Sequence, residues 1–296
     1  MLLRAPCKIN LTLDVFDKKE RTDGYHNLDS IVVPFGEPAD ELRITIKPSE
    51  ISSISLTCNN SCLPTDNRNL AYRAAEAYLT SIDETVRIEI DLCKHIPSEA
   101  GLGGGSSDAA AVLRALNTYF NQKLDHSSMI TLAARLGGDI PLFLAQKPVR
   151  MRGKGDLVEP LDFELPIFYG VIVHPGTGVS TPHAYSLLDA VPNRQFGNGT
   201  EKFLAHLREY NSRNIIDLLV TEMSNDFESI ILSAYSDVKK TYEMIMSAGA
   251  LRALLCGSGS AVFGLARDRD HAKQLVDILT NHFPFVTLGS NFHKFP

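Results

Sequence analysis

A run of glycines at residues 101–105 is the part of the sequence best suited to bind an anion. Gly101-Leu102-Gly103-Gly104-Gly105-Ser106-Ser107-Asp108 leads directly into an apolar, alanine-rich segment, residues 109–116. Four glycines in five residues let the backbone adopt left-handed conformations and keep side chains away from a ligand. The two serines and Asp108 can cap the helix that follows, and the start of a helix presents free N–H groups at the positive end of its dipole. The segment therefore predicts a phosphate-binding loop.

Three common nucleotide-binding motifs do not fit this loop. No Lys-Ser or Lys-Thr pair follows the glycines, which excludes a Walker A loop, and the sequence has neither the His-Arg-Asp nor the Asp-Phe-Gly motif of protein kinases. A dinucleotide-binding fold needs a strand directly before the glycines, but residues 93–100 separate them from the strand-like segment 86–92. The loop therefore indicates a nucleotide site of another kind.

Composition limits the classes of protein to consider. The chain has 296 residues, 44% of them hydrophobic and 22% charged, which is typical of a globular protein with two domains or one large one. A net charge of −6 argues against a general binder of nucleic acid or of acidic membranes. Five scattered cysteines predict free thiols in a reducing compartment. Without an apolar run of 18 residues or a cleavage signature, we expect a cytoplasmic protein.

Apolar periodicity predicts helices and strands interspersed in both halves of the chain, with a break near residues 159–166. Asp66 or Asn67 is the expected cap of the first helix, and Gly137-Gly138 the stop of the third. The polar segment 191–200 predicts a surface insertion. This pattern indicates an α+β or α/β architecture in two units. Strands are predicted at residues 7–15, 30–35, 41–46, 86–92, 168–174, 251–255, 261–265 and 286–288, and helices at 69–79, 106–120, 127–136, 215–219, 225–248 and 271–281.

Four further segments carry residues that could do chemistry, although each alone also fits an ordinary strand or turn. Lys8 and Asn10 are two positions apart in a strand-like run and so share a face. Asp23-Gly24-Tyr25-His26 is a turn that presents an aromatic ring beside an imidazole. Asp139 lies between a glycine pair and a proline. Residues 256–260, Cys-Gly-Ser-Gly-Ser, form either a hairpin turn or a second set of N–H donors facing the first loop.

The order and approximate spacing of these segments resemble the GHMP kinases, a superfamily of ATP-dependent small-molecule kinases. The loop that begins at Pro97 and ends in Gly-Leu-Gly-Gly-Gly-Ser-Ser is typical of the superfamily, and Asp-Gly-Tyr-His points to members whose acceptor alcohol carries a cytidine diphosphate. The resemblance covers nearly the whole chain. It implies a two-domain α+β fold with the active site in the cleft: an N-terminal ribosomal-protein-like β-α-β domain (1–160) and a C-terminal ferredoxin-like domain (161–296).

The resemblance also implies a reaction. ATP would phosphorylate the 2-hydroxyl of 4-diphosphocytidyl-2-C-methyl-D-erythritol, in the non-mevalonate pathway to isoprenoids, with Asp139 and Lys8 as the catalytic residues. Magnesium would accompany ATP, with Ser106 as a ligand. The residues that would bind ATP are Pro97, Ser98, Glu99, Ala100, Gly101, Leu102, Gly103, Gly104, Gly105, Ser106 and Ser107.

The cytidine of this acceptor implies a site for its base. Tyr25 and Tyr185 would stack on the two faces of the cytosine, and stacking alone cannot distinguish cytosine from uracil. His26, with backbone groups, would hydrogen-bond to the edge of the base, where a mismatch leaves a buried polar group unpaired. Asn10 and Thr181 are the other predicted substrate-binding residues.

Two alternatives remain open. Another GHMP kinase, such as a homoserine kinase, would use the same Lys8 and Asp139 on a different alcohol and would need no aromatic base site. A non-catalytic ligand sensor of the same fold would have no need of either residue. We expect a monomer or weak homodimer, and we expect Glu99 to turn its carboxylate away from the ATP phosphates.

Overall fold

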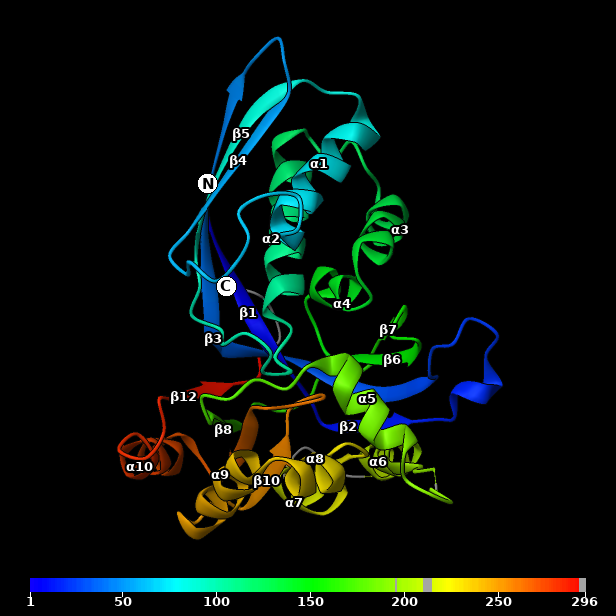
Figure 1. Ribbon diagram of the computed structural model, residues 1–296, viewed down its shortest axis with the longest axis vertical. Helices are drawn as coiled ribbons and strands as arrows, with labels where there is room; N and C mark the ends of the chain where they lie inside the picture. Colours follow the sequence, from blue (N-terminus) through cyan, green and yellow to red (C-terminus); the bar gives the residue numbers. More distant parts are fainter. Residues whose placement is uncertain (195, 210–214, 293–296) are drawn as a thin grey trace.

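The computed structural model describes residues 1–194, 196–209 and 215–292, and it contains two β-sheets with helices packed on them (Figure 1). The first sheet comprises β1 (Leu2–Asn10), β2 (Thr12–Val15), β3 (Leu28–Pro48), β4 (Ser53–Cys58), β5 (Val86–Cys93), β6 (Val149–Gly153), β7 (Leu157–Pro160) and β9 (Ser224–Asn225). The second comprises β8 (Tyr169–His174), β10 (Arg252–Leu255), β11 (Val262–Ala266) and β12 (Phe285–Ser290). The helices are α1 (Leu70–Ile82), α2 (Gly104–Tyr119), α3 (His126–Leu136), α4 (Ile140–Ala145), α5 (Thr181–Asp189), α6 (Gly199–Glu209), α7 (Ile215–Glu222), α8 (Glu228–Ala234), α9 (Ser236–Ser247) and α10 (Arg269–Leu279), and a short 3-10 helix spans Lys18–Glu20.

The long strand β3 organises the first sheet, because β1, β2, β5 and β6 all pair with it in antiparallel register. We predicted two separate strands at 30–35 and 41–46, and this was wrong. Cys7 pairs with Phe35 while Pro6 pairs with Ala39, so residues 36–38 form a bulge rather than a turn. Conversely, the predicted strand 7–15 is divided at Leu11 into β1 and β2.

Two predicted helix boundaries were also wrong. Helix α1 is capped by Asn69, whose Oδ1 accepts from the N–H of Ala71 (2.9 Å), while Asp66 instead binds Arg68. The predicted helix 225–248 is two helices, because Tyr235 adopts an extended conformation between α8 and α9. The predicted stop at Gly137 is confirmed, since α3 ends at Leu136.

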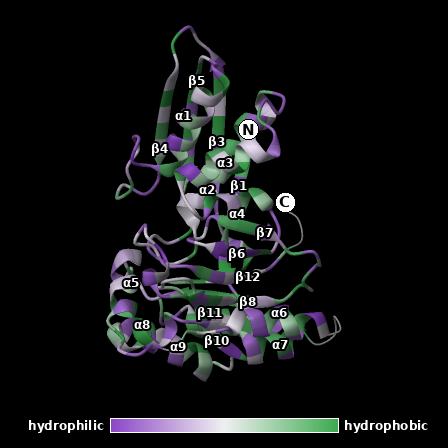
Figure 2. Ribbon diagram, turned by 90° about the vertical axis from the view of Figure 1, so that its right-hand side faces the viewer, coloured by the Kyte–Doolittle hydropathy of each residue, from purple (hydrophilic) through white to green (hydrophobic). Residues whose placement is uncertain are grey.

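The second sheet lies between the N-terminal domain and a layer of helices, as Figures 1 and 2 show from two sides. Its strand order is β10-β11-β8-β12, all antiparallel, with α10 connecting β11 to β12, which is the ferredoxin-like arrangement. Phe35 of β3 meets Phe263 of β11 edge to face, with ring centroids 5.5 Å apart. The two sheets therefore share a hydrophobic core.

The predicted insertion 191–200 is exposed only in part. Gln195 lies outside the described residues, and Val191 to Asn193 are exposed, but Thr200 is fully buried. The buried carboxylate of Asp14 accepts from the backbone N–H groups of Gly199 (3.0 Å) and Thr200 (2.8 Å). A carboxylate at the start of a helix offsets its dipole and satisfies its first donors. The end of this segment therefore docks α6 onto β2.

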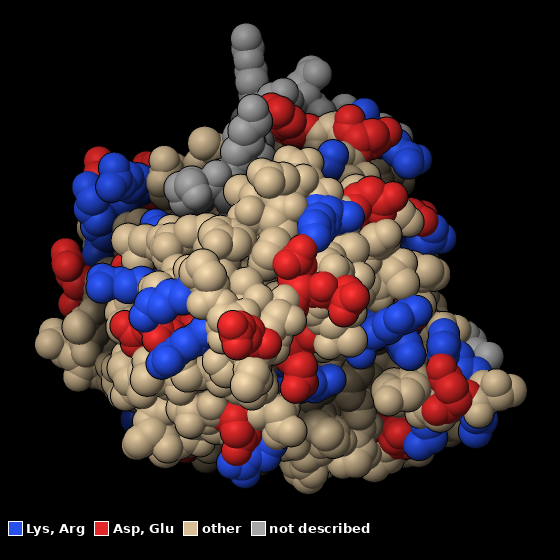
Figure 3. Space-filling model, turned by 90° about the horizontal axis from the view of Figure 1, so that it is seen from above, with Lys and Arg blue, Asp and Glu red and all other residues tan. Residues whose placement is uncertain are grey.

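Seen from the N-terminal domain, acidic and basic side chains alternate over a mostly uncharged surface, with no single sign prevailing on this face (Figure 3). Among the residues that the structure describes, no helix combines the length and the hydropathy needed to cross a bilayer.

The two glycine-containing loops meet through their backbones. The N–H groups of Ser260 and Ala261 donate to the carbonyl groups of Glu99 and Ala100, each at 3.2 Å. The second loop is thus both the hairpin turn between β10 and β11 and a partner of the first loop. At Gly101, whose φ is +73°, a Cβ atom would lie 1.8 Å from the carbonyl oxygen of Cys256. No side chain can occupy that position without separating the loops.

We expect Gly101→Ala to lower the free energy of unfolding by about 2 kcal/mol or more, since the left-handed conformation alone costs about 1–2 kcal/mol before the steric clash is counted. Gly105→Ala is the matched control: Gly105 lies in α2, and its Cβ would meet only Leu70, at 3.7 Å. This control should leave stability unchanged or raise it by about 0.5–1 kcal/mol. Urea unfolding measures both, and equal effects would contradict the loop contact.

Candidate active site

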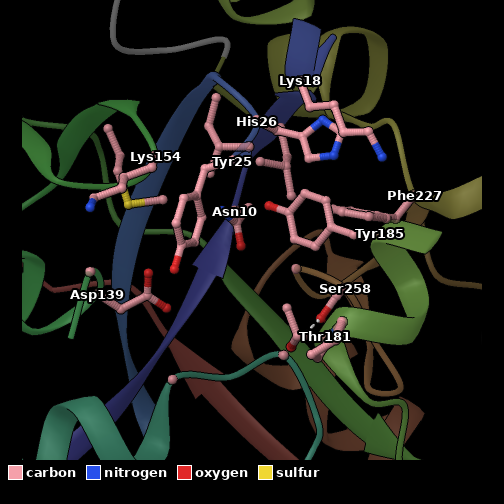
Figure 4. A pocket seen from close by; sticks show the side chains of 18 of the residues that line it. Asn10, Lys18, Tyr25, His26, Asp139, Lys154, Thr181, Tyr185, Phe227 and Ser258 are labelled. Atoms are coloured by element: carbon pink, nitrogen blue, oxygen red, sulfur yellow. Dashed lines mark hydrogen bonds between the residues drawn. The ribbon is translucent and has the colours of Figure 1, made fainter. Parts of the chain in front are cut away.

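Two cavities flank the first glycine loop. The larger, about 790 Å³, lies between β1, the loop and α5, and the smaller, about 260 Å³, is lined by the loop, the start of α1 and Lys94. Gly101 and Gly103 line both cavities, so the loop forms the wall between them. Figure 4 shows side chains from several distant segments converging on the larger cavity.

Lys8 and Asn10 lie on one face of β1, as predicted, and both reach the larger cavity. The Lys8 ammonium donates to Asn10 Oδ1 at 2.6 Å, and the backbone N–H of Lys8 donates to the carbonyl of Leu102 in the glycine loop at 3.0 Å. A Cβ at Gly257 would lie 3.0 Å from the ammonium, so the second loop leaves room for it. Lys8 is thus held at both ends: its backbone is hydrogen-bonded to the first glycine loop, and its ammonium is hydrogen-bonded to Asn10.

Asp139 comes to the same cavity from the start of α4. It occupies the N-cap position, yet its side chain makes no capping hydrogen bond, so its carboxylate stays available to the cavity, where Figure 4 shows it. Among the described residues no ion pair joins it to Lys8, whose ammonium contacts Asn10 instead. A proton-accepting group and a cation therefore line one cavity without neutralising each other.

Tyr25, His26 and Tyr185 form an aromatic group in this cavity. Tyr25 is 58% exposed, and Figure 4 shows it across the cavity from Tyr185. Tyr185 stacks on His26 (centroids 4.9 Å apart) and meets the buried ring of Phe227 edge to face at 4.9 Å. Burial, together with the nearby Asp139 carboxylate, raises the pKa of Tyr185, which keeps its hydroxyl protonated. One ring is thus held firmly and the opposite one is open to a ligand.

Both ring nitrogens of His26 already contact the protein. Nδ1 donates to the carbonyl of Phe16 at 2.8 Å, and Nε2 lies 3.2 Å from Asp189, which also accepts from Lys18 at 2.6 Å. The side chain therefore supports Tyr185 rather than offering a free nitrogen to a base. We predicted that His26, with backbone groups, contacts the base edge; because both ring nitrogens contact protein groups, the side-chain part of this prediction finds no free nitrogen, and the backbone part stays a prediction.

The sequence motifs did not single out several residues that line the larger cavity. Lys154 places its ammonium 5.2 Å from the centre of the Tyr25 ring, a cation–π arrangement. Lys8, Lys18 and Lys154 are three lysines in a cavity that also holds two aspartates, Asp139 and Asp189. A chain of net charge −6 thus has a locally basic cavity, which favours an anionic ligand. The only sequence signal for Lys154 is its place between two glycines.

The predicted ATP-binding residues are divided among several places. Ser106 lines the larger cavity, and Pro97, Ser98, Ala100 and the residues 101–105 line the smaller one. Glu99 and Ser107 line neither cavity. Glu99 is exposed beside Gly178, as expected for a carboxylate kept from phosphates, and Ser107 is buried in the first turn of α2. Thr181 lines the larger cavity, with its hydroxyl 3.0 Å from that of Ser258.

The capping role that we assigned to Ser106, Ser107 and Asp108 was wrong. Gly103 is the N-cap of α2, and Asp108 is buried in a cluster with Lys94 and Asp40. Lys94 Nζ donates to Asp108 Oδ2 at 2.7 Å and to Asp40, whose other oxygen accepts from the N–H groups of His95 (2.6 Å) and Ile96 (2.8 Å). Asp108 Oδ1 has no partner among the described residues. Burial raises the pKa of Asp108 against the opposing attraction of Lys94.

The donor groups near the loop fit magnesium better than a transition metal. All five cysteines are free, and within the described ranges no group of three or more His, Cys, Asp or Glu side chains could hold a metal. Ser106 and Asp139 offer oxygen atoms to the same cavity. Magnesium prefers oxygen ligands and usually takes only one or two from protein, the rest coming from phosphates and water.

Comparison with known proteins is consistent across the whole chain. Residues 69–147 match the family described as GHMP kinases N terminal domain, and residues 207–284 match GHMP kinases C terminal. The chain is 40% identical to a 4-diphosphocytidyl-2-C-methyl-D-erythritol kinase of Solidesulfovibrio magneticus, covering 97% of this chain and 96% of that one. A relative of the same name from a Geobacter species is 36% identical, with 92% and 91% covered.

Solved structures resemble it as well. The crystal structure of a 4-(cytidine 5'-diphospho)-2C-methyl-D-erythritol kinase matches with a TM-score of 0.80 and 34% identity, covering 98% of both chains. A homoserine kinase from Cytophaga hutchinsonii matches with a TM-score of 0.70 at 19% identity, over 99% of this chain and 95% of that one, which shows a common fold and no more.

The buried cluster predicts how stability depends on pH. A carboxyl group whose pKa is higher in the folded than in the unfolded state stabilises the fold at low pH, and this contribution is lost as pH rises through the folded pKa. We therefore expect wild type to lose stability relative to Asp108→Asn from about pH 4, the ordinary carboxyl pKa, up to about pH 8, the raised pKa of Asp108, by at most about 1.4 kcal/mol per pH unit. Urea unfolding across this range measures it. Asp162→Asn, at an exposed position, is the control, and parallel curves for Asp108→Asn and wild type would contradict the shift.

Proposed function

The chain belongs to the GHMP kinases, and from that premise we propose that it transfers the γ-phosphoryl group of ATP to the 2-hydroxyl of 4-diphosphocytidyl-2-C-methyl-D-erythritol. It is an ATP-dependent phosphotransferase of isoprenoid precursor biosynthesis by the non-mevalonate route. The observation that carries this conclusion is the division of the site by the glycine loop: a small cavity on one side, and on the other a larger one holding Asp139, Lys8 and an open aromatic pair.

The nucleotide would occupy the smaller cavity, with its phosphates over the loop. Residues 97, 98 and 100–105 line this cavity, and Gly101 and Gly103 also line the larger one. The start of α2 offers backbone N–H groups to the phosphates. The γ-phosphoryl group would then lie beside Lys8, whose backbone is bonded to the loop. Magnesium bound with ATP would be held by Ser106 together with phosphate oxygens, and it would supply charge neutralisation.

Asp139 and Lys8 would then carry out the transfer. Phosphoryl transfer has a largely loose transition state, so positioning and charge stabilisation contribute most. Asp139 would orient the acceptor hydroxyl and take its proton. Lys8 would neutralise charge that develops on the transferred group. Because its ammonium is not paired with Asp139, its charge remains available to the reacting oxygens.

The acceptor's cytosine would enter between Tyr25 and Tyr185. Stacking contributes about 1–3 kcal/mol per base on the scale of stacked nucleic-acid bases. His26 would support Tyr185 through its own stacking contact and through its bond to Phe16. The diphosphate would be met by the lysines of this cavity, since Lys154 lies directly above Tyr25. Asn10 and Thr181 would line the path between base and reacting hydroxyl.

The alternatives account for less of the site. A small amino-acid alcohol needs neither an aromatic pair nor a cavity of about 790 Å³. A ligand sensor does not explain why one cavity holds both Lys8, which forms no ion pair among the described residues, and Asp139, an N-cap residue whose side chain makes no capping hydrogen bond. The boundary between residues 160 and 161, a monomeric or weakly dimeric state and a cytoplasmic location stay predictions. The boundary coincides with the change from β7 in the first sheet to β8 in the second, although β9 returns to the first sheet.

An assay of ADP release tests the function. Purified protein receives ATP with 4-diphosphocytidyl-2-C-methyl-D-erythritol, homoserine or mevalonate, and we expect release with the first alone. Asp139→Asn and Lys8→Ala should each lower kcat about 100-fold or more while ATP still binds. Asp270→Asn, at a side chain 84% exposed, is the control. Near-normal turnover by Asp139→Asn would refute its role, and release with homoserine alone would refute the proposed acceptor.

The base site predicts a split between the two Michaelis constants. Tyr25→Leu keeps an apolar side chain but removes the stacking face, so the KM of the cytidine acceptor should rise about tenfold while that of ATP stays unchanged. His26→Ala should act in the same direction by loosening Tyr185. Tyr119→Leu, at a comparably exposed tyrosine on α2, should change neither constant. A parallel rise of both constants in Tyr25→Leu would contradict the assignment.

A further inference from the structure

We propose that Ser30 is a positioning residue for phosphoryl transfer: it fixes the orientation of the Asn10 amide, and Asn10 in turn holds the Lys8 ammonium. The proposal rests on the proposed function for the role of Lys8, but its geometry can be tested without turnover. Ser30 lies in β3 and does not line the cavity, whereas Asn10 and Lys8 do. An effect of Ser30 on the reaction must therefore pass through its neighbours.

Three short hydrogen bonds connect these residues in a line. Lys8 Nζ donates to Asn10 Oδ1 at 2.6 Å, Asn10 Nδ2 donates to Ser30 Oγ at 2.8 Å, and Ser30 Oγ donates to the backbone carbonyl of Thr12 at 2.5 Å. The side chains are buried, with exposed fractions of 5% for Lys8, 2% for Asn10 and 0% for Ser30. Water therefore has little access to replace any member of the line.

The carbonyl of Thr12, at the end of this line, determines which group donates in each hydrogen bond. A carbonyl oxygen can only accept, so Ser30 must use its single proton on Thr12. Ser30 Oγ is then left to accept, and the group of Asn10 that faces it must be the NH₂. The amide oxygen consequently faces Lys8. Without the Ser30 hydroxyl, the Lys8 ammonium, which can only donate, is the one member of the line that still opposes a flip of the amide, and the amide loses its second anchor.

The choice of an amide also matters for the charge. Asn10 orients the ammonium through a dipole and leaves its net charge intact, whereas a carboxylate at this position would neutralise it. Within the described part of the chain Lys8 forms no ion pair, so the orientation of this dipole decides where the cation lies relative to the glycine loop. A cation placed before the reaction starts stabilises developing charge without reorganisation.

The kinetics of single and double variants test whether Ser30 acts on the reaction through Asn10. Ser30→Ala should lower kcat about tenfold or more, the effect of losing one charge-assisted hydrogen bond, while the KM of ATP changes less than about twofold. Ser30→Thr keeps the hydroxyl and should retain most of kcat. In an Asn10→Ala background, Ser30→Ala should have no further effect, because the residue through which it acts is gone.

Thr241→Val is the matched control. Thr241 is also fully buried and donates to a backbone carbonyl, that of Asp237 at 2.8 Å, but it lies in α9 away from both cavities. It should lose stability as Ser30→Ala does and keep kcat. The proposal is overturned if Ser30→Ala leaves kcat unchanged, if its effect multiplies with that of Asn10→Ala, or if Thr241→Val lowers kcat equally.

Hydrogen exchange of the Asn10 side chain provides a readout without turnover. In the wild-type protein, the NH₂ signal that disappears in Asn10→Ala should be protected from exchange with solvent, and an unprotected signal overturns the proposal even if Ser30→Ala does not fold. If the wild type releases no ADP with any acceptor, the proposed function fails while this measurement still decides whether the Asn10 NH₂ is held in a hydrogen bond.

Discussion

The backbone contact between the two glycine loops is the constraint on which the rest of the site depends. The carbonyl groups of Glu99 and Ala100 accept from the second loop, and Gly101 lies so close to Cys256 that no side chain fits between them. These loops come from the two domains, and Lys8 is bonded to the first loop by its own backbone. One set of backbone contacts therefore fixes the position of the first glycine loop, the junction of the two domains and Lys8, the proposed catalytic lysine.

Two lysines beside the loop show how burial and partners give one residue type different tasks. Lys94 lies between Asp40 and Asp108, and although burial alone would lower its pKa, the attraction of these carboxylates raises it. Its charge is therefore neutralised by ion pairs that hold β3 and α2 together beside the first glycine loop. Lys8 is also buried, but its ammonium hydrogen-bonds to the neutral amide of Asn10 and forms no ion pair among the described residues, so no carboxylate neutralises its charge. Lys94 therefore stabilises the fold, while the charge of Lys8 is available for the role proposed for it.

Features that depend on the spacing of a few neighbouring residues could be predicted from the sequence. Lys8 and Asn10 share a face because side chains alternate in a strand, and α3 ends at a glycine, as such helices commonly do. The predictions were wrong where the role of a side chain depends on a partner far away in the sequence. Asp108 follows two serines and has the composition of a cap, but it pairs with Lys94, and Asp40 joins them from 54 residues before Lys94. The roles of His26 and Ser30 likewise depend on Asp189 and Asn10, which lie in other strands or helices.

The wall between the two cavities also has a kinetic meaning. Because Gly101 and Gly103 are the residues common to both linings, the proposed nucleotide and acceptor would each fill a separate cavity. On that proposal, separate cavities would let either ligand bind first and either product leave first. The two ligands would contact opposite sides of the loop backbone at Gly101 and Gly103. Any cooperativity between them would therefore be limited by how far this backbone can move.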